Sequence, residues 1–456
     1  MSSGATAGPL GREACERLAD AAFQAAPEGA DVEVIVSRSA TGLTRFANSQ
    51  VHQNVWRDDI AVHVRVVAAG GRAGVISVHT DDPVHVAQAA VQAGDVARIS
   101  PQDPEYPGLA AAAAVGAVPL DENTAAASPD DRAAAVRAIL DEVPDDMEAA
   151  GAYRTGTSEL AVFTSAGQRV YAPTSAVNLT LVVMSDTSSG WAEGGGRAMG
   201  DVDPRAAGAT AVAKAIAGRE PVEVPAGSWP VVLEPPAVAT VMQFLAYLGF
   251  SGRSYLEGRS FVSDRLGEQF VDPRLTLVDD AVSAAATGLP FDLEGTPKQR
   301  VELLRAGVAA GVVHDRHSAA LAGTDSTGHG LQAPNSYGAL PTDPVLLPGD
   351  DGSVDDLVAA CERGLLVTRF HYTNVVHPKE ASITGMTRDG TFLVEDGRIT
   401  SAVRNLRFTQ SILEALASID GLSTETRYAT EIFDDGSRFP ALALPAFTFN
   451  STTTFV

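Results

Sequence analysis

Histidines are the residues of this chain best suited to bind a metal, and two of them are closely spaced. His314 and His317 lie three residues apart in the segment VVHDRH. On a helix this spacing would place both imidazoles on one face, which suits a pair of metal ligands. The sequence fixes no third ligand nearby, so the favoured interpretation is a pair of surface or hydrogen-bonded histidines. The same interpretation holds for His371 and His377, which flank the segment YTNVV.

Other motifs that would indicate catalysis are absent or incomplete. The sequence contains no GxSxG nucleophile elbow and no HExxH zinc motif. Two glycine-rich segments, GWAEGGGRAMG at 190–200 and GTDSTGHG at 323–330, lack the GK[ST] ending of a phosphate-binding loop. We interpret the first as tight turns and the second as a turn-rich loop. Motif chemistry alone therefore identifies no class of enzyme.

Composition and charge narrow the class of protein. The chain has 456 residues, a length that predicts two domains or one elaborate domain. Of these residues 45% are hydrophobic and 20% charged, which is typical of a globular protein. A net charge of -24 argues against nucleic acid or an anionic membrane as a partner. The two cysteines, Cys15 and Cys361, form no paired motif, so we expect neither a disulfide framework nor a zinc ribbon. The N-terminus lacks a secretory signal and no apolar run is long enough to span a bilayer, so we expect a cytoplasmic protein.

The first half of the chain reads as an α+β domain. Two helices, at 11–26 and after the capping residue Asp82, flank segments in which apolar and polar residues alternate. These segments predict an antiparallel β-meander, with turns at the sequences ANS and AAGGR. A proline-rich connection, a helix near 130, a hairpin centred on Gly167 and a helix at 204–216 complete this half. A proline-rich stretch suggests that the domain comprises residues 1–222.

The second half, residues 223–456, reads as mainly β. Short strands between glycines predict a curved or barrel-like sheet with a few helices. Helices are expected after Pro236 and at 407–419. The stretch 322–356 predicts a long loop without regular structure, which is usually functional or interfacial.

Several segments of this chain resemble those of a known family. They are SFVSDRLGEQFVDPRLTLVDD at 260–280, FDLEGTPKQRVELLRAGVAAGVVHDRHSA at 291–319, and the stretches 335–370 and 390–416. Together with the N-terminal segment RFANSQVHQN, they resemble the TldD/PmbA family of DNA gyrase modulators and microcin-processing peptidases. The resemblance covers nearly the whole chain, and four segments in the right order make it specific.

The resemblance implies two kinds of subunit. The TldD kind carries an HExxxH motif on a helix and a C-terminal cysteine that hold zinc, with the glutamate as general base. The TldE (PmbA) kind lacks this motif. In this chain the motif would fall near Gln243, Phe244 and Leu248. No His or Cys occurs between Val231 and Val312, and the C-terminal cysteine is missing.

We therefore expect no catalytic or metal-binding residue on that helix. Instead we expect an ordinary packing helix with one buried face, formed by Val241, Phe244, Leu245 and Leu248.

The resemblance implies a metal-free, TldE-like partner subunit of a heteromeric protease. Zinc is expected in a TldD-type partner, with no cofactor in this chain, and the substrate is expected to be an unfolded or small peptide. We assign Asp292, Glu294, His314 and His317 to the chamber or to an interface. One alternative is a self-sufficient hydrolase with a relocated metal site at His314 and His317, completed by His371 or His377. Another is a non-proteolytic binding or scaffold protein in peptide or natural-product maturation.

Overall fold

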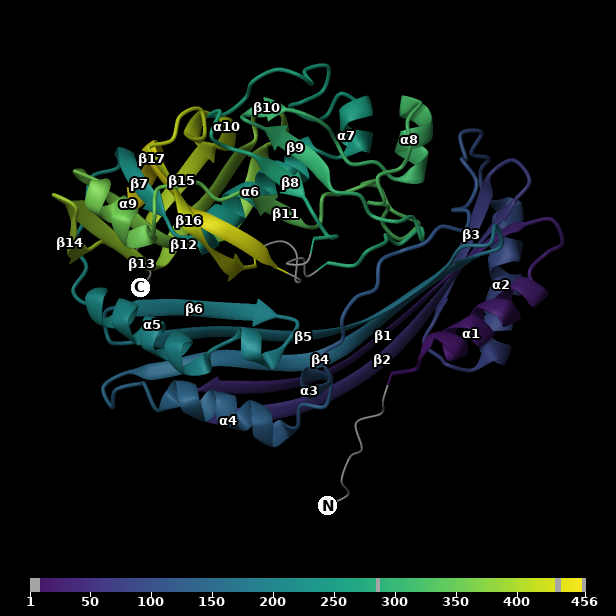
Figure 1. Cartoon of the computed structure of the whole chain (residues 1–456), viewed down its shortest axis with the longest axis horizontal. Coiled ribbons are helices and arrows are strands. Elements are labelled where there is room, and N and C mark those ends of the chain that lie inside the picture. The colour runs from purple at the N-terminus through teal and green to yellow at the C-terminus, as the bar shows by residue number, and fades with distance from the viewer. Residues whose placement is uncertain (1–8, 284–287, 431–435, 453–456) are drawn as a thin grey trace.

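The computed structural model describes residues 9–283, 288–430 and 436–452 of the chain. It has an α+β architecture, as the sequence predicts. A long antiparallel sheet with flanking helices forms the N-terminal half, and a mainly β C-terminal half packs against one face of that sheet (Figure 1). Within the described residues, no helix combines the length and apolar character needed to cross a bilayer.

The N-terminal sheet has six strands in the order β3-β2-β1-β4-β5-β6, and every neighbouring pair is antiparallel. The predicted meander is therefore confirmed, but its segments merge into longer strands. Asn48 and Ser49 turn the chain with positive φ values of 50° and 55°, as a tight hairpin requires. The segment 190–200, predicted as turns, instead contains an edge strand. The strands are β1 (Asp31–Ala47), β2 (Gln50–Ala68), β3 (Arg72–Val78), β4 (Glu148–Thr164), β5 (Arg169–Met184) and β6 (Ser189–Gly196).

Helices cover one face of this sheet. Apolar side chains at every second position of the strands point towards the helices. Val34 and Val64 pack against the first two helices of the chain, and Leu179 and Leu181 pack against the helices near residues 136 and 211. The opposite face carries Glu33 and Ile35 towards the C-terminal half. The helices are α1 (Arg12–Ala25), α2 (Pro83–Ile99), α3 (Glu122–Ala125), α4 (Pro129–Leu140) and α5 (Pro204–Ala217), with a 3-10 turn η1 (Met199–Asp201) before α5. Asp82 caps α2 as predicted, since its carboxylate accepts the Val84 N–H at 2.9 Å.

The C-terminal half contains a closed, barrel-like sheet, which confirms the expected curvature. Its strands pair in the order β12-β7-β17-β15-β13, and β13 pairs again with β12 to close the circle. β14 and β16 extend it. The strands are β7 (Gly227–Leu233), β12 (Arg363–His377), β13 (Ser382–Glu395), β14 (Arg398–Ala402), β15 (Leu406–Ser411), β16 (Gly421–Ala429) and β17 (Ser437–Thr452).

A smaller sheet and several short helices complete the C-terminal half. The sheet has the order β10-β9-β8-β11. Its strands are β8 (Leu277–Asp279), β9 (Val301–Arg305), β10 (Val308–Ala309) and β11 (Pro344–Leu346). The helices are α6 (Pro235–Gly249), α7 (Gly252–Leu256), α8 (Arg316–Ala322), α9 (Val354–Ala360) and α10 (Ile412–Ala415), with a 3-10 turn η2 (Pro378–Glu380).

Two expectations for this half are wrong. The segment 407–419 is strand β15 followed by the single turn α10, because β15 pairs with both β13 and β17 and buries Leu406 and Phe408 on one side. The stretch 322–356 is not structureless, because it contains β11 and the start of α9. For β15 and β11, pairing with distant strands decides the local structure.

Candidate functional site

Helix α6 lies in the main core of the C-terminal half. Two prolines, Pro235 and Pro236, begin the helix, where their missing N–H groups cost nothing. Every residue of α6 except Pro236 and Tyr247 is buried. The sequence predicted one buried face, but strands β12 and β17 and the smaller sheet's β11 contact the helix from different sides. A helix enclosed in this way is hydrophobic all round.

The predicted metal-motif positions fall inside this buried helix. Gln243 is 1% exposed, Phe244 8% and Leu248 7%. Phe244 and Leu248 present only hydrocarbon, whereas zinc requires nitrogen, sulfur or oxygen ligands. The residues present on α6 therefore do not fit a zinc ion.

A pocket of about 670 Å³ opens at the C-terminal end of α6. Tyr247 and Leu248 of α6 line it, together with the exposed Lys379 of η2. Arg259, which follows α7, and Tyr337, in the loop before β11, also belong to the wall. The volume lies in the range of small-molecule sites. We call this cavity the α6 pocket.

The loop that carries Tyr337 is held in place by local contacts. The Ser251 hydroxyl donates to the Tyr337 carbonyl at 3.2 Å. The Asn335 side chain accepts the N–H groups of Tyr337 and Gly338 at 3.1 and 2.7 Å. Gly338 has φ of 75°, and a Cβ there would lie 2.8 Å from Cβ of Arg253, so the turn needs glycine. The Tyr247 and Tyr337 rings lie next to each other in the pocket lining, with centroids 6.3 Å apart and planes tilted by 54°.

The histidine pair of the sequence does not lie on one helix. His314 precedes α8, whose N-cap is Asp315, so the helical-spacing argument for a shared metal fails. The His314 Nδ1 atom lies 3.1 Å from the Ser318 hydroxyl, and burial lowers the pKa of His314. His317 is partly exposed, with Nε2 3.9 Å from Asp103 Oδ2.

The other two histidines, His371 and His377, have different neighbours. His371 packs edge-on against the Tyr372 ring, with centroids 4.8 Å apart, whereas His377 lines the α6 pocket. Among residues 9–283, 288–430 and 436–452, no group of three or more His, Cys, Asp and Glu residues is arranged to hold a metal ion.

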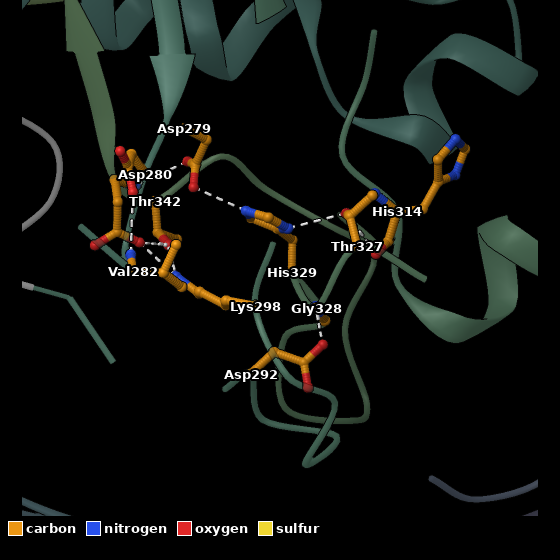
Figure 2. A network of polar contacts seen from close by, with 12 residues as sticks. Asp279, Asp280, Val282, Asp292, Lys298, His314, Thr327, Gly328, His329 and Thr342 are labelled. Atoms are coloured by element: carbon orange, nitrogen blue, oxygen red, sulfur yellow. Dashed lines mark hydrogen bonds and ion pairs between the residues drawn. The ribbon is translucent and has the colours of Figure 1, made fainter. Parts of the chain in front are cut away.

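A buried polar network, which sequence reasoning did not identify, lies next to His314 (Figure 2). The His329 Nε2 atom lies 2.8 Å from Asp279 Oδ1, and His329 Nδ1 lies 2.9 Å from the Thr327 hydroxyl. Lys298 forms an ion pair with Asp343 and donates to Thr342 at 2.7 Å. The only sequence signal is the histidine inside the glycine-rich segment 323–330, a segment whose composition predicts a turn-rich loop.

The charges of this network stabilise one another. Burial by itself raises the pKa of Asp279, but the hydrogen bond from His329 and the Lys298 ammonium hold that pKa below its usual value. Burial likewise opposes the charge of Lys298, and the carboxylates of Asp343 and Asp279 outweigh it and raise the pKa of Lys298.

A carboxylate, an imidazole and a hydroxyl in a row are the parts of a nucleophilic triad, but here the hydroxyl is already engaged. The Thr327 oxygen accepts the His314 N–H at 2.7 Å and can donate to the His314 carbonyl at 3.1 Å. The side chains of His329 and Asp279 are 0% exposed. A nucleophile must reach its substrate, so the arrangement supports the fold rather than catalysis.

Asp292 and Glu294 also lie in buried surroundings, at the contact between the two halves. The Asp292 carboxylate accepts the N–H groups of Thr296 and Gly330 at 2.8 and 2.7 Å, and Glu294 accepts the N–H of Arg316 at 2.9 Å. Burial raises the pKa of Asp292 to about 6 and that of Glu294 well above its usual value. Neither residue lines the α6 pocket.

Glu33 of β1 faces the same region from the N-terminal sheet. Burial raises its pKa to about 7, although the Arg65 guanidinium, 3.8 Å away, opposes the shift. Hydrogen bonds also cross this contact, since Gln168 donates to the Gly295 carbonyl at 2.6 Å.

Comparison with known proteins identifies the family. Residues 226–452 match the PmbA/TldA metallopeptidase C-terminal domain, and residues 32–94 match PmbA/TldA metallopeptidase domain 1. The chain belongs to the PmbA/TldD metallopeptidase family. Helix α6, its pocket and the buried network all lie in the family's C-terminal domain, whereas Glu33 lies in domain 1.

Curated relatives match the chain over part of its length. A "Metalloprotease TldD homolog" from Haemophilus influenzae is 29% identical over 214 residues, which is 46% of this chain and 43% of the relative. A "Metalloprotease" from Methanothermobacter thermautotrophicus is 22% identical over 203 residues, 44% of each chain. The match thus spans less than half the length of these PmbA/TldD relatives.

Solved structures match over nearly the whole fold. TldE from Thermococcus kodakarensis superposes with a TM-score of 0.85 at 21% identity, covering 96% of this chain and 100% of the other. A putative modulator of a DNA gyrase from Thermotoga maritima gives 0.81 at 18% identity, covering 96% and 99%. The PmbA/TldD fold therefore extends from the first sheet to the last.

Proposed function

We propose that this chain is the metal-free, TldE-type subunit of a heteromeric zinc peptidase that acts on unfolded or small peptides in the cytoplasm. One observation carries the proposal. The helix on which TldD-type subunits are expected to hold zinc is here a buried core helix, with Phe244 and Leu248 at motif positions. These side chains supply neither a metal ligand nor a general base.

Two further findings support a partner role. The chain has the fold of a protein that is called TldE along its whole length, and its sequence relatives include proteins named TldD homologues. In the proposed assembly the TldD-type subunit supplies zinc and the general base. This chain supplies part of the chamber wall and contacts to the peptide, without a cofactor of its own.

Co-purification with a TldD-type subunit from the same cell tests the proposal. We expect a stable complex with zinc in the partner, and peptide cleavage by the complex but not by this chain alone. Substituting His314 and His317 with alanine should leave the cleavage activity unchanged. Zinc-dependent cleavage by the isolated chain, or a mixture that neither associates nor gains activity, would overturn the proposal.

A further inference from the structure

The α6 pocket has an apolar part built from distant segments. Leu248 from α6, Leu340 from the loop before β11, and Val375 and Pro378 from the end of β12 and η2 line it. Leu248 is buried, but the rim residues are exposed, so the cavity is open to a ligand. An apolar side chain of a ligand would bury its surface here, which favours binding.

The rim of the same pocket is cationic. Arg259 and Lys379 line it together with one carboxylate, that of Glu380. Glu257 accepts from Arg259 at 2.6 Å and from Arg253 at 2.9 Å, so two guanidinium groups share this one carboxylate. Within the described residues, Lys379 has no ion-pair partner. A net positive rim in a chain of net charge -24 favours an anionic group on the ligand.

A pair of tyrosines, Tyr247 and Tyr337, adds a hydrogen-bond donor beside the cations. Burial, followed by the neighbouring Tyr337, raises the pKa of Tyr247. The Tyr247 and Tyr337 hydroxyls also hydrogen-bond to each other, so one hydroxyl proton of the pair remains to donate to an oxygen of the ligand.

We propose that the α6 pocket binds the C-terminal end of a peptide. The peptide's terminal carboxylate contacts Lys379 and Arg259, and its last side chain, an apolar one, packs against Leu248 and Leu340. The inference rests on the proposed function only for the choice of a peptide as ligand. In this proposal the α6 pocket binds one end of the peptide and takes no part in cleavage.

Binding of a labelled peptide to the isolated, metal-free chain tests this inference. The peptide is a short run of alanines ending in phenylalanine, with the label at its N-terminus, and fluorescence anisotropy reports binding. A matched peptide carries a C-terminal amide, and another carries the amide together with an aspartate side chain near its end. We expect the free acid to bind about tenfold more tightly than either amide, because a charge-assisted contact is lost in both.

Variants locate the contact. Lys379→Ala should weaken binding of the free acid about tenfold and leave binding of the plain amide unchanged, since the charge it contacts is then absent. Leu248→Trp should abolish binding of both peptides by filling the cavity. Arg57→Ala, which removes a cation that is 73% exposed on β2, is the control and should change nothing.

Three outcomes would overturn the inference: equal binding of acid and amide, equal binding by the wild-type and Lys379→Ala chains, or unchanged binding by a folded Leu248→Trp chain. Full recovery of affinity by the aspartate-bearing amide would also overturn it, because an acidic side chain and not the chain terminus would then be the ligand. Because the assay needs neither zinc nor a partner, its failure is distinguishable from failure of the heteromeric assembly.

Discussion

The Nε2 atom of His329 lies 2.8 Å from Oδ1 of Asp279, and both side chains are 0% exposed. The pair joins strand β8 to the glycine-rich segment 323–330. The other Asp279 oxygen accepts the Asp343 N–H at 2.9 Å, next to β11. One buried carboxylate thus connects β8 with two stretches of chain that are far from it in the sequence.

Removing one member of this pair should be costly. We expect His329→Leu to lower the free energy of unfolding by about 3–5 kcal/mol, because it leaves the Asp279 carboxylate buried without its partner. Urea denaturation measures the change. The double variant Asp279→Leu with His329→Leu should lose less than the sum of the two single variants. Additive losses would contradict the coupling, and His85→Leu, at an exposed position, is the control.

The Glu33 carboxyl should make stability depend on pH. Its pKa is raised from 4.5 to about 7, so folding favours the neutral acid. The stabilisation is complete below pH 4.5 and is lost as the pH rises through about 7, an effect on the order of 3 kcal/mol. Glu33→Gln, which stays neutral, should therefore gain stability relative to the wild type between pH 5 and pH 8.

Denaturant unfolding at several pH values measures that difference. The charges of three neighbours also affect the pKa of Glu33: Arg65 and Arg316 lower it and Asp292 raises it. The measured pH dependence therefore includes their influence. Glu105→Gln, at an exposed position, should show no such trend. A stability difference between Glu33→Gln and wild type that is the same at all pH values would exclude Glu33 as the titrating group.

Helix α6 should tolerate truncation poorly. Leu245 is 0% exposed, and Leu245→Ala should cost about 2–5 kcal/mol through lost apolar burial and the remaining cavity. Leu321→Ala, at a position 46% exposed in α8, is the matched control and should cost far less. Similar losses in the two variants, measured by denaturant unfolding, would show that α6 is less tightly enclosed than described.

The two thiols should react at different rates. Cys15 is 1% exposed, and burial raises its pKa to about 12, so the reactive thiolate is scarce at neutral pH. Cys361 is only half-buried, although burial raises its pKa as well. We expect a thiol reagent to modify Cys361 slowly in the native chain and Cys15 only on unfolding. Rapid modification of a Cys361→Ala chain under native conditions would contradict this assignment.

Local sequence signals predicted the elements that depend on neighbouring residues. Alternation of apolar and polar residues gave the strands of the N-terminal sheet, and Asp82 followed by Pro83 marked the start of α2. The absence of His and Cys between Val231 and Val312 indicated that α6 carries no zinc motif. Residue type and spacing suffice for such features because turns, caps and metal ligands depend on side-chain chemistry.

The tertiary structure alone decided the features that need distant segments. The segment 407–419 has a helical apolar pattern, yet β15 forms because β13 and β17 offer hydrogen bonds on both sides. The contact between His329 and Asp279 and the α6 pocket between Leu248 and Lys379 join stretches with no shared sequence signal. Burial, pairing and cavities are properties of the assembled chain, because each depends on which remote residues exclude water from a given side chain.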